Sequence, residues 1–228
     1  MFKIVSVAGL GRRGVASGRF ALAVFDVDGT IVDVESSWRY LHERLGTWSV
    51  GRVYAQRFHR GEITYEEWAE LDASLWRGIP VERLRRLIQE IRYVRGARET
   101  IRALREAGVK VALLSAGLTL ITERIQREIG VDYAVANELL VEDGVLTGEV
   151  RVRVAYGGKT DVLREILRHF KVDAKQCVVV GDDETLIPTF KLAGLAIAFN
   201  PRTAEVAKNA HITIKEKDLS RVLSHILG

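Results

Sequence analysis

Two aspartates, Asp26 and Asp28, stand directly after an apolar run in the sequence ALAVFDVDGT, which covers residues 21–30. The apolar run predicts a buried strand, and alternate positions of a strand share a face, so both carboxylates would point the same way. An unpaired buried carboxylate is costly, so something at the end of this strand must compensate the charge. Because hard cations prefer oxygen ligands, a divalent cation is the simplest candidate.

Other reactive side chains stand at the ends of later predicted strands. One apolar run ends at Ser115, another ends at Asp182 and Asp183, and Lys159 follows a glycine pair at the start of a predicted helix. Ligands of open α/β sheets bind beyond the carboxyl ends of the strands, so we expect these groups at one edge of the sheet. Carboxylates for a metal, a hydroxyl and a cation suit an anionic substrate beside Mg²⁺, and phosphoryl transfer above all.

The elements that must position these residues follow an alternating pattern. Beyond residue 96, near-continuous apolar strands alternate with amphipathic helices, which is typical of a parallel sheet covered on both faces. Asp143 and Gly144 predict the turn of a hairpin over residues 139–147. A separate short strand is expected over residues 133–135. We therefore expect an α/β protein with a doubly wound, mostly parallel sheet.

Four helical patterns interrupt this alternation between residues 33 and 95, with no strand pattern among them. A capping box of Thr64 and Glu67 begins the third helix, and Pro80 begins the fourth. We expect this block to be an inserted α-helical cap domain. Its tryptophans would form a small core, or one or two would line a pocket against the main domain. The four tryptophans of the chain all lie in this block: Trp38, Trp48, Trp68 and Trp76.

The expected domain organisation follows from these patterns. An α/β catalytic core would comprise residues 20–32 and 96–228, interrupted by the helical cap of residues 33–95. Residues 1–19 would form a leader outside both.

The leader carries glycines spaced as in a dinucleotide-binding fingerprint: Gly9, Gly11 and Gly14. That fingerprint needs a helix directly after the glycines. The next apolar strand begins almost at once, at Phe20, and leaves no room for the helix. We expect no dinucleotide site.

Composition excludes several classes of protein. The chain has 228 residues, a formal net charge of +4 and 47% hydrophobic residues, which is enough for a sizeable core. Its basic residues alternate with acidic ones along helices, as over residues 82–90, so we expect no nucleic-acid partner. No apolar run approaches the roughly 20 residues that span a bilayer, and we expect no membrane association. One cysteine, Cys177, in an apolar run fits a core residue of a cytoplasmic protein.

These residues carry a resemblance to the haloacid dehalogenase superfamily of phosphatases, and within it to the phosphoserine-phosphatase group. Four motifs occur in the family's order: DVDGT from residue 26, SAG from residue 115, Lys159, and GDD from residue 181. The resemblance runs from about Phe20 to the C-terminus. A helical insertion directly after the first motif is similar to the small cap domain of that group.

The resemblance implies a role for each residue. Asp26 would attack phosphorus to form an aspartyl-phosphate, and Asp28 would act as general acid and then as general base. Ser115 and Lys159 would bind the phosphate. Mg²⁺ would be held by the Asp26 carboxylate, the Asp28 backbone carbonyl and the Asp182 carboxylate.

The fourth motif departs from the family pattern. An acid usually follows four residues after the first aspartate of this motif, and this chain has Leu186 there. That acid generally supports the metal shell, so its loss is expected to weaken Mg²⁺ binding. Asp183, next to Asp182, is the candidate replacement.

The cap also departs from the phosphoserine-phosphatase pattern. Glu35 matches a cap glutamate of that group and is a candidate substrate-binding residue. The group's carboxylate-binding arginine aligns with Asp72, which cannot bind a carboxylate. Arg52 or Arg57 would have to serve instead.

The sequence therefore predicts a Mg²⁺-dependent phosphatase that hydrolyses a small phosphorylated metabolite through an aspartyl-phosphate. Leu186 motivates one alternative, a non-catalytic binding module on the same scaffold. A dehalogenase is the other, and Asp28 argues against it because a dehalogenase has no alkoxide to protonate. The sequence leaves the natural substrate and the oligomeric state open.

Overall fold

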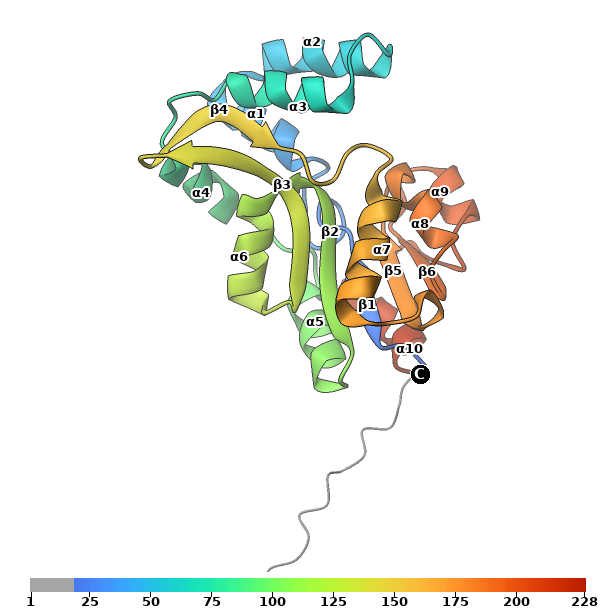
Figure 1. Ribbon diagram of the computed structural model, residues 1–228. Coiled ribbons are helices and arrows are strands. Elements are labelled where there is room, and N and C mark those ends of the chain that lie inside the picture. Colours follow the sequence, from blue (N-terminus) through green and yellow to red (C-terminus); the bar gives the residue numbers. More distant parts are fainter. Residues whose placement is uncertain (1–18) are drawn as a thin grey trace, which may run out of the picture.

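A seven-stranded sheet forms the centre of the protein, in a computed structural model that describes residues 19–228 (Figure 1). The strand order is β4-β3-β2-β1-β5-β6-β7, and every neighbouring pair is parallel except β3 and β4. This confirms the expected doubly wound, mostly parallel sheet. The strands are β1 (Leu22–Phe25), β2 (Lys110–Leu118), β3 (Tyr133–Glu142), β4 (Val145–Arg151), β5 (Cys177–Gly181), β6 (Leu195–Phe199) and β7 (Ile212–Ile214).

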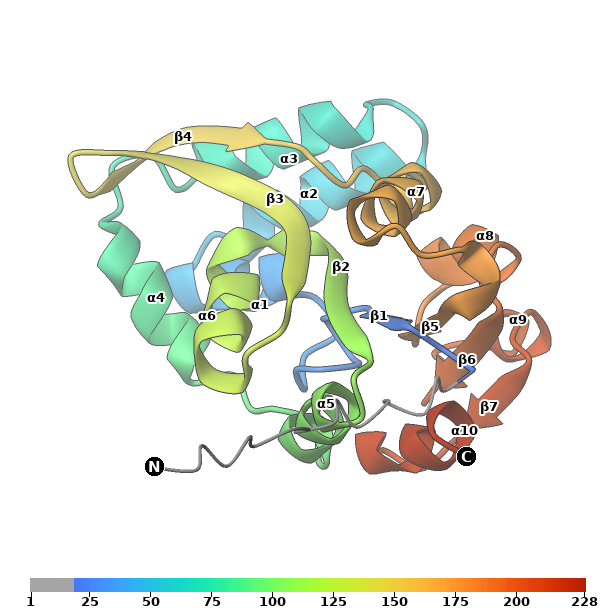
Figure 2. The same ribbon diagram turned by 60° about the horizontal axis from the view of Figure 1, so that its bottom comes forward.

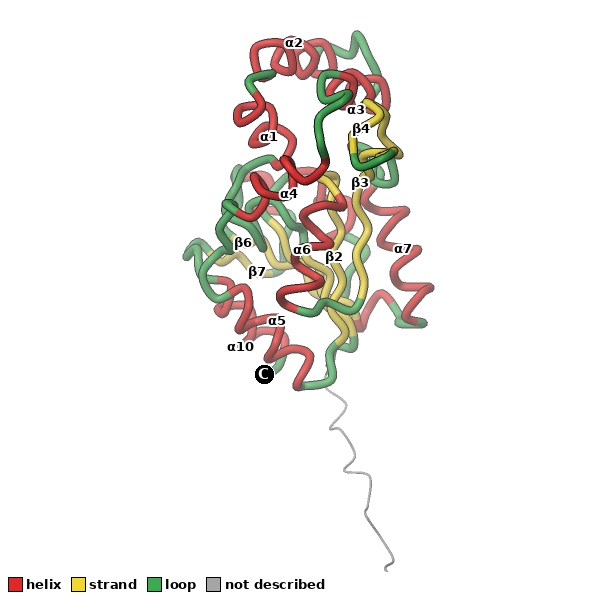
Figure 3. The backbone as a smooth tube through the Cα atoms, turned by 90° about the vertical axis from the view of Figure 1, so that its left-hand side faces the viewer, coloured by secondary structure: helices red, strands yellow, loops and turns green. Residues whose placement is uncertain are grey.

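Helices cover both faces of the sheet (Figure 3). One buried cluster joins the sheet to α5, α6 and α10, and a second joins its other face to α7, α8 and α9. Alternation along β1 explains the two clusters, because Ala23 and Phe25 pack in the first while Leu22 and Val24 pack in the second. The covering helices are α5 (Ala97–Glu106), α6 (Thr119–Ile129), α7 (Lys159–Phe170), α8 (Ile187–Phe190), α9 (Ala204–Lys208) and α10 (Leu223–Ile226).

Strand β1 is fully buried at the centre of the sheet, between β2 and β5. Phe25 at its end is level with Leu113 of β2 and Val180 of β5. The residues that follow these positions therefore emerge side by side at the carboxyl edge. Ser115 differs from expectation in one respect, because β2 continues past it to Leu118 and Ser115 lies within the strand.

Four consecutive helices, called the helical insert below, separate β1 from α5. Its helices α2 and α3 lie above the carboxyl edge at the top of Figure 1. Helix α3 begins with the predicted capping box, in which Thr64 and Glu67 each accept the other's main-chain N–H. The four helices are α1 (Ser37–Leu45), α2 (Trp48–His59), α3 (Tyr65–Ser74) and α4 (Val81–Gln89).

The β3–β4 hairpin extends beyond the sheet and supports the insert (Figure 2). Its turn is the predicted one, with left-handed φ values of 49° at Asp143 and 80° at Gly144. The expectation of a separate short strand before it is wrong, because β3 runs unbroken over ten residues. Main-chain bonds tie the hairpin to the loop before α4: Gly78 to Leu146 at 2.8 Å and Leu146 to Ile79 at 2.9 Å.

Residues 1–18, the part of the expected leader that carries its glycines, lie outside the described residues. Within residues 19–228, no helix combines the length and apolar character that a membrane crossing requires.

We predict that Gly144→Ala lowers the free energy of unfolding by about 1–2 kcal/mol, because a β-carbon is strained at this positive φ. No heavy atom lies within 4 Å of the added carbon, so a clash would not contribute. Urea denaturation measures the change, and Glu142→Ala at the neighbouring exposed position is the control. Equal denaturation midpoints for the two variants would contradict the prediction.

Candidate active site

A cavity of about 170 Å³ opens at the carboxyl edge, between the core strands and the helical insert. The structure brings six of the seven predicted site residues to its wall. The seventh, Asp182, lines the adjoining groove together with Gly29 and Asn200. The six that line the cavity are Asp26, Asp28, Glu35, Ser115, Lys159 and Asp183.

Asp26 and Lys159 form a buried ion pair at the centre of the site. The Lys159 Nζ atom donates to Asp26 Oδ2 at 2.6 Å, and the other carboxylate oxygen accepts the Val27 N–H at 2.7 Å. Burial raises the pKa of Asp26 to about 7, and the charges of Asp183 and Asp182 add to this, while Lys159 opposes it. The site therefore holds more negative charge than its lysine compensates.

Asp28 lies beside this pair with one oxygen engaged. Its Oδ2 atom accepts the main-chain N–H of Ser37 at 2.7 Å, at the start of α1. Its Oδ1 atom is buried and has no hydrogen-bond partner among residues 19–228. Burial raises the pKa of this carboxyl, although the Ser37 hydrogen bonds oppose the shift. A carboxyl with a free oxygen and a raised pKa is suited to transferring a proton.

The end of β2 approaches Asp28 closely. Ser115 is buried, and its Oγ atom accepts the Gly117 N–H at 3.0 Å. A β-carbon at Gly117 would lie 2.6 Å from Ser37 Oγ and 3.3 Å from Asp28 Oδ2. The SAG sequence thus needs glycine at its third position for the strand end to pass the helical insert.

Arg202 is a residue of the site that the sequence analysis missed. Its Nε atom donates to Asp182 Oδ2 at 2.6 Å, and its Nη2 atom donates to the main-chain carbonyl of Glu35 at 2.8 Å. Burial raises the pKa of Asp182 to about 6, against the opposing charge of Arg202. Arg202 follows β6, the neighbour of β5, so the rule that sites form at the carboxyl ends of strands would have indicated it.

Asp183 and Leu186 occupy different environments. Asp183 Oδ1 accepts the N–H and the hydroxyl of Thr185, at 3.0 and 2.5 Å, and lies 3.8 Å from Lys159 Nζ. Burial alone would raise the pKa of Asp183, but the Lys159 charge and the Thr185 hydrogen bonds outweigh it and lower the pKa. Leu186 is fully buried against Gly181 and packs in the core cluster on the α7 face.

The donor groups fit a magnesium ion. Among residues 19–228, no three His, Cys, Asp or Glu side chains converge as a metal cluster. A cation at this edge would have the carboxylates of Asp26 and Asp182 and the main-chain carbonyl of Asp28. Mg²⁺ commonly uses one or two carboxylates and completes its shell with water and substrate phosphate. The raised pKa of Asp26 also marks negative charge that a cation would stabilise.

Two aromatic side chains of the helical insert donate to one main-chain oxygen of the core, which also accepts from a core amide. The Ala116 carbonyl accepts hydrogen bonds from Trp38 Nε1 at 3.2 Å, Tyr65 Oη at 3.0 Å and Asn137 Nδ2 at 2.9 Å. Both expectations for the tryptophans hold in part, because Trp38 lines the cavity and stacks on Trp76, which is fully buried.

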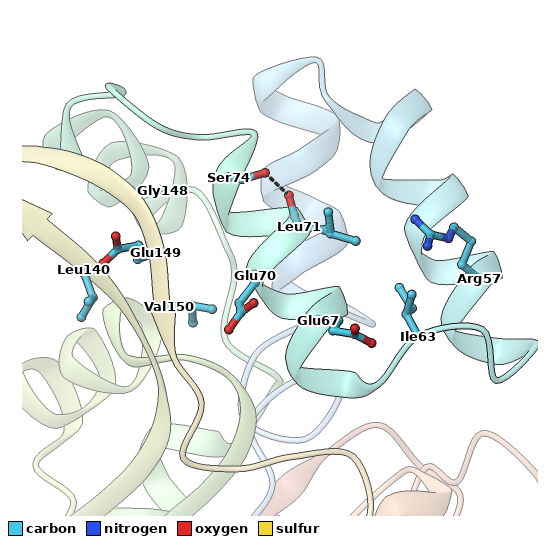
Figure 4. A pocket seen from close by; sticks show the side chains of 10 residues that line it. All are labelled: Arg57, Ile63, Glu67, Glu70, Leu71, Ser74, Leu140, Gly148, Glu149 and Val150. Atoms are coloured by element: carbon cyan, nitrogen blue, oxygen red, sulfur yellow. Dashed lines mark hydrogen bonds between the residues drawn. The ribbon is translucent and has the colours of Figure 1, made fainter.

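The arginine substitutes proposed from the sequence do not line this cavity. Asp72, at the aligned arginine position, is buried with its Oδ1 atom 3.2 Å from His42 Nε2. Arg52 is exposed on α2. Arg57 lines a separate, larger cavity of about 690 Å³ between α3 and β4, shown in Figure 4. That cavity is also lined by Glu67, Glu70 and Glu149.

Comparison with known proteins identifies the family of this chain. Residues 23–189 match the model of the haloacid dehalogenase-like hydrolases. The phosphoserine phosphatase of Archaeoglobus fulgidus is 38% identical over 82% of this chain, which spans 54% of that protein's length. The phosphoserine phosphatase of Methanocaldococcus jannaschii is 32% identical, over 90% of this chain and 97% of that protein.

A solved structure described as a substrate-bound phosphoserine phosphatase complex superposes with a TM-score of 0.78. Its sequence identity is 31%, over 91% of this chain and 98% of that one. A phospho-aspartyl intermediate analogue of phosphoserine phosphatase gives the same TM-score. The resemblance inferred from the motifs is confirmed. The chain belongs to the haloacid dehalogenase-like hydrolase family, as a phosphoserine-phosphatase-like member.

Proposed function

We propose that this protein is a Mg²⁺-dependent phosphatase that hydrolyses a small phosphomonoester through an aspartyl-phosphate. One observation carries the proposal: the buried Asp26 carboxylate lies 2.6 Å from Lys159 in a cavity that is also lined by Asp28, whose Oδ1 atom has no hydrogen-bond partner among residues 19–228. A nucleophile, a cation and a proton carrier thus meet in one small space. The four family motifs and the phosphoserine phosphatase relatives support the same reaction.

In the first step, a carboxylate oxygen of Asp26 forms a bond to phosphorus as the bond from phosphorus to the substrate oxygen breaks. Asp28, in the protonated form that its raised pKa favours, gives its proton to the departing alkoxide. Lys159 and the hydroxyl of Ser115 stabilise the charge on the transferring phosphoryl oxygens. The products are an alcohol and phosphorylated Asp26.

In the second step, water attacks phosphorus and the acyl-phosphate bond breaks. Asp28, now a carboxylate, accepts a proton from that water through its free Oδ1 atom. Inorganic phosphate leaves and Asp26 is regenerated. The main chain of Ser37 holds the other oxygen of Asp28 throughout, and so keeps the carboxyl oriented.

The carboxylates of Asp26 and Asp182 and the carbonyl of Asp28 would hold Mg²⁺, which when bound neutralises charge on the phosphoryl group. Arg202 fixes the orientation of Asp182 by occupying its other oxygen. We further propose that residues 33–95 act as a cap, whose opening admits substrate and whose closure excludes bulk water.

The substrate would be a small phosphorylated metabolite.

The protein would be located in the cytoplasm. Cys177, the one cysteine of the chain, is buried, and burial raises the pKa of its thiol to about 12. Such a thiol suits a structural residue and no redox role.

We predict that Asp26→Asn abolishes hydrolysis of p-nitrophenyl phosphate with Mg²⁺, because the amide cannot form the acyl phosphate. Asp28→Asn should slow turnover by about 10²–10⁴-fold, since it removes both proton transfers. Steady-state rates measure both effects, and circular dichroism confirms folding. Equal rates for the wild-type protein and Asp26→Asn would instead support the alternative of a non-catalytic binding module.

We predict that Mg²⁺ binding weakens as the pH falls below about 7. Asp26 has a pKa of about 7 without metal, so below that pH a proton occupies the carboxylate and must leave when Mg²⁺ binds. Titration calorimetry in two buffers of different ionisation enthalpy measures the released protons. An affinity independent of pH, with no proton release, would contradict this assignment of Asp26.

We predict that Leu186→Asp lowers the free energy of unfolding by about 2–5 kcal/mol, because it places a carboxylate in the apolar core. It should not tighten metal binding, since the Leu186 side chain is fully buried in the apolar core cluster on the α7 face. Leu186→Ala separates the effect of the cavity from that of the charge. Urea denaturation and Mn²⁺ binding followed by electron paramagnetic resonance test the two parts. Tighter Mn²⁺ binding by Leu186→Asp would overturn the prediction.

A further inference from the structure

Three aromatic side chains lie in the wall of the active-site cavity. Trp38, Tyr65 and Tyr156 line it, and Tyr156 contacts Phe58 of α2 edge-on, with ring centroids 5.3 Å apart. The Trp38 side chain has one N–H donor and the Tyr65 side chain one O–H donor, and both donate to the Ala116 carbonyl. They therefore have no N–H or O–H donor left for a bound alcohol.

The cations of this cavity are already paired. Lys159 binds Asp26, and it is the residue that the phosphate would engage. Arg202 binds Asp182 and the carbonyl of Glu35. The insert lines this cavity with no cation, since Asp72 is buried against His42 and Arg57 lines a different cavity. A carboxylate on the substrate would lose its hydration here without gaining a new partner.

Glu35 is a carboxylate in the cavity wall that neither the proposed chemistry nor the proposed metal site uses. Among residues 19–228, its side chain makes no hydrogen bond within 3.5 Å and no ion pair within 4.0 Å. A substrate carboxylate would meet its like charge. A substrate ammonium group would meet its opposite charge, beside aromatic faces that attract cations.

We propose that the site selects phosphomonoesters of small amino alcohols that carry an ammonium group and no carboxylate. This rests on the phosphatase function proposed above. A cavity of about 170 Å³ limits the alcohol to a few heavy atoms. The aromatic side chains of the wall also disfavour polyol phosphates, whose hydroxyl groups need several hydrogen-bond partners.

Three substrates that differ by one group test the proposal. O-phosphoethanolamine carries the ammonium alone, O-phospho-L-serine adds a carboxylate, and 2-hydroxyethyl phosphate replaces the ammonium by a hydroxyl. With Mg²⁺, we expect kcat/KM for phosphoethanolamine to exceed both others by about tenfold or more, the size of one hydrogen bond to a charged group. A phosphoserine value equal to or above that of phosphoethanolamine overturns the proposal, and so does an equal value for 2-hydroxyethyl phosphate.

Glu35→Gln tests the residue that would bind the ammonium. We expect the ratio of phosphoethanolamine to 2-hydroxyethyl phosphate activity to fall toward one in this variant. Glu123→Gln, at an exposed glutamate of α6 outside the cavity, should keep the wild-type ratio. An unchanged ratio in Glu35→Gln removes Glu35 from the proposal and contradicts it.

Binding to the full-length Asp26→Asn protein with Mg²⁺ separates the substrate class from the reaction. Calorimetry should show phosphoethanolamine binding at least about tenfold tighter than phosphoserine. If the wild-type protein hydrolyses no phosphomonoester, p-nitrophenyl phosphate included, the proposed phosphatase function fails. The binding order then still decides the substrate class, and tighter binding of phosphoserine overturns it.

Discussion

The buried ion pair of Asp26 and Lys159 is the constraint on which the site depends. Four aspartates, Asp26, Asp28, Asp182 and Asp183, lie within the carboxyl edge of a well-packed apolar sheet, where uncompensated charge is costly. Lys159 lies between Asp26 and Asp183. Removing one partner of such a pair leaves an uncompensated buried charge, so replacing either residue alone would destabilise the protein. A Mg²⁺ ion would complete the charge balance that the lysine begins.

The topology of the sheet brings the residues of this cluster together. Strand β1 pairs on one side with β2 and on the other with β5, so three segments far apart in the sequence end side by side. The insert leaves the core directly after the first of these ends, where Asp28 bonds to the first residue of α1. Opening of the insert would therefore act on the proton carrier as well as on the entrance to the cavity.

Much of this site was predictable from the sequence, because apolar runs ending in acids or hydroxyls are visible in it. Asp26, Asp28, Ser115 and Lys159 lie together as expected. Arg202 was missed although it follows the carboxyl end of β6, because the sequence does not show that its long side chain reaches Asp182 after the neighbouring strand. Main-chain acceptors such as the Ala116 carbonyl are likewise invisible in a sequence, since every residue has one. The hairpin that continues β3 is bonded to the loop before α4, and such a tertiary contact is not visible in the sequence.

The core and the insert would divide recognition between them, and the Ala116 carbonyl is one of the atoms that couple them. The core carries the groups proposed to handle the phosphoryl group, whereas the insert supplies Glu35, Trp38 and Tyr65. Trp38 and Tyr65 donate to the Ala116 carbonyl, next to Ser115, so the proposed closure of the insert would bear directly on the end of β2 that carries Ser115. An alcohol that keeps the insert from closing would therefore also disturb the Ser115 hydroxyl. Fit of the alcohol can thus govern the rate of phosphoryl transfer as well as the affinity.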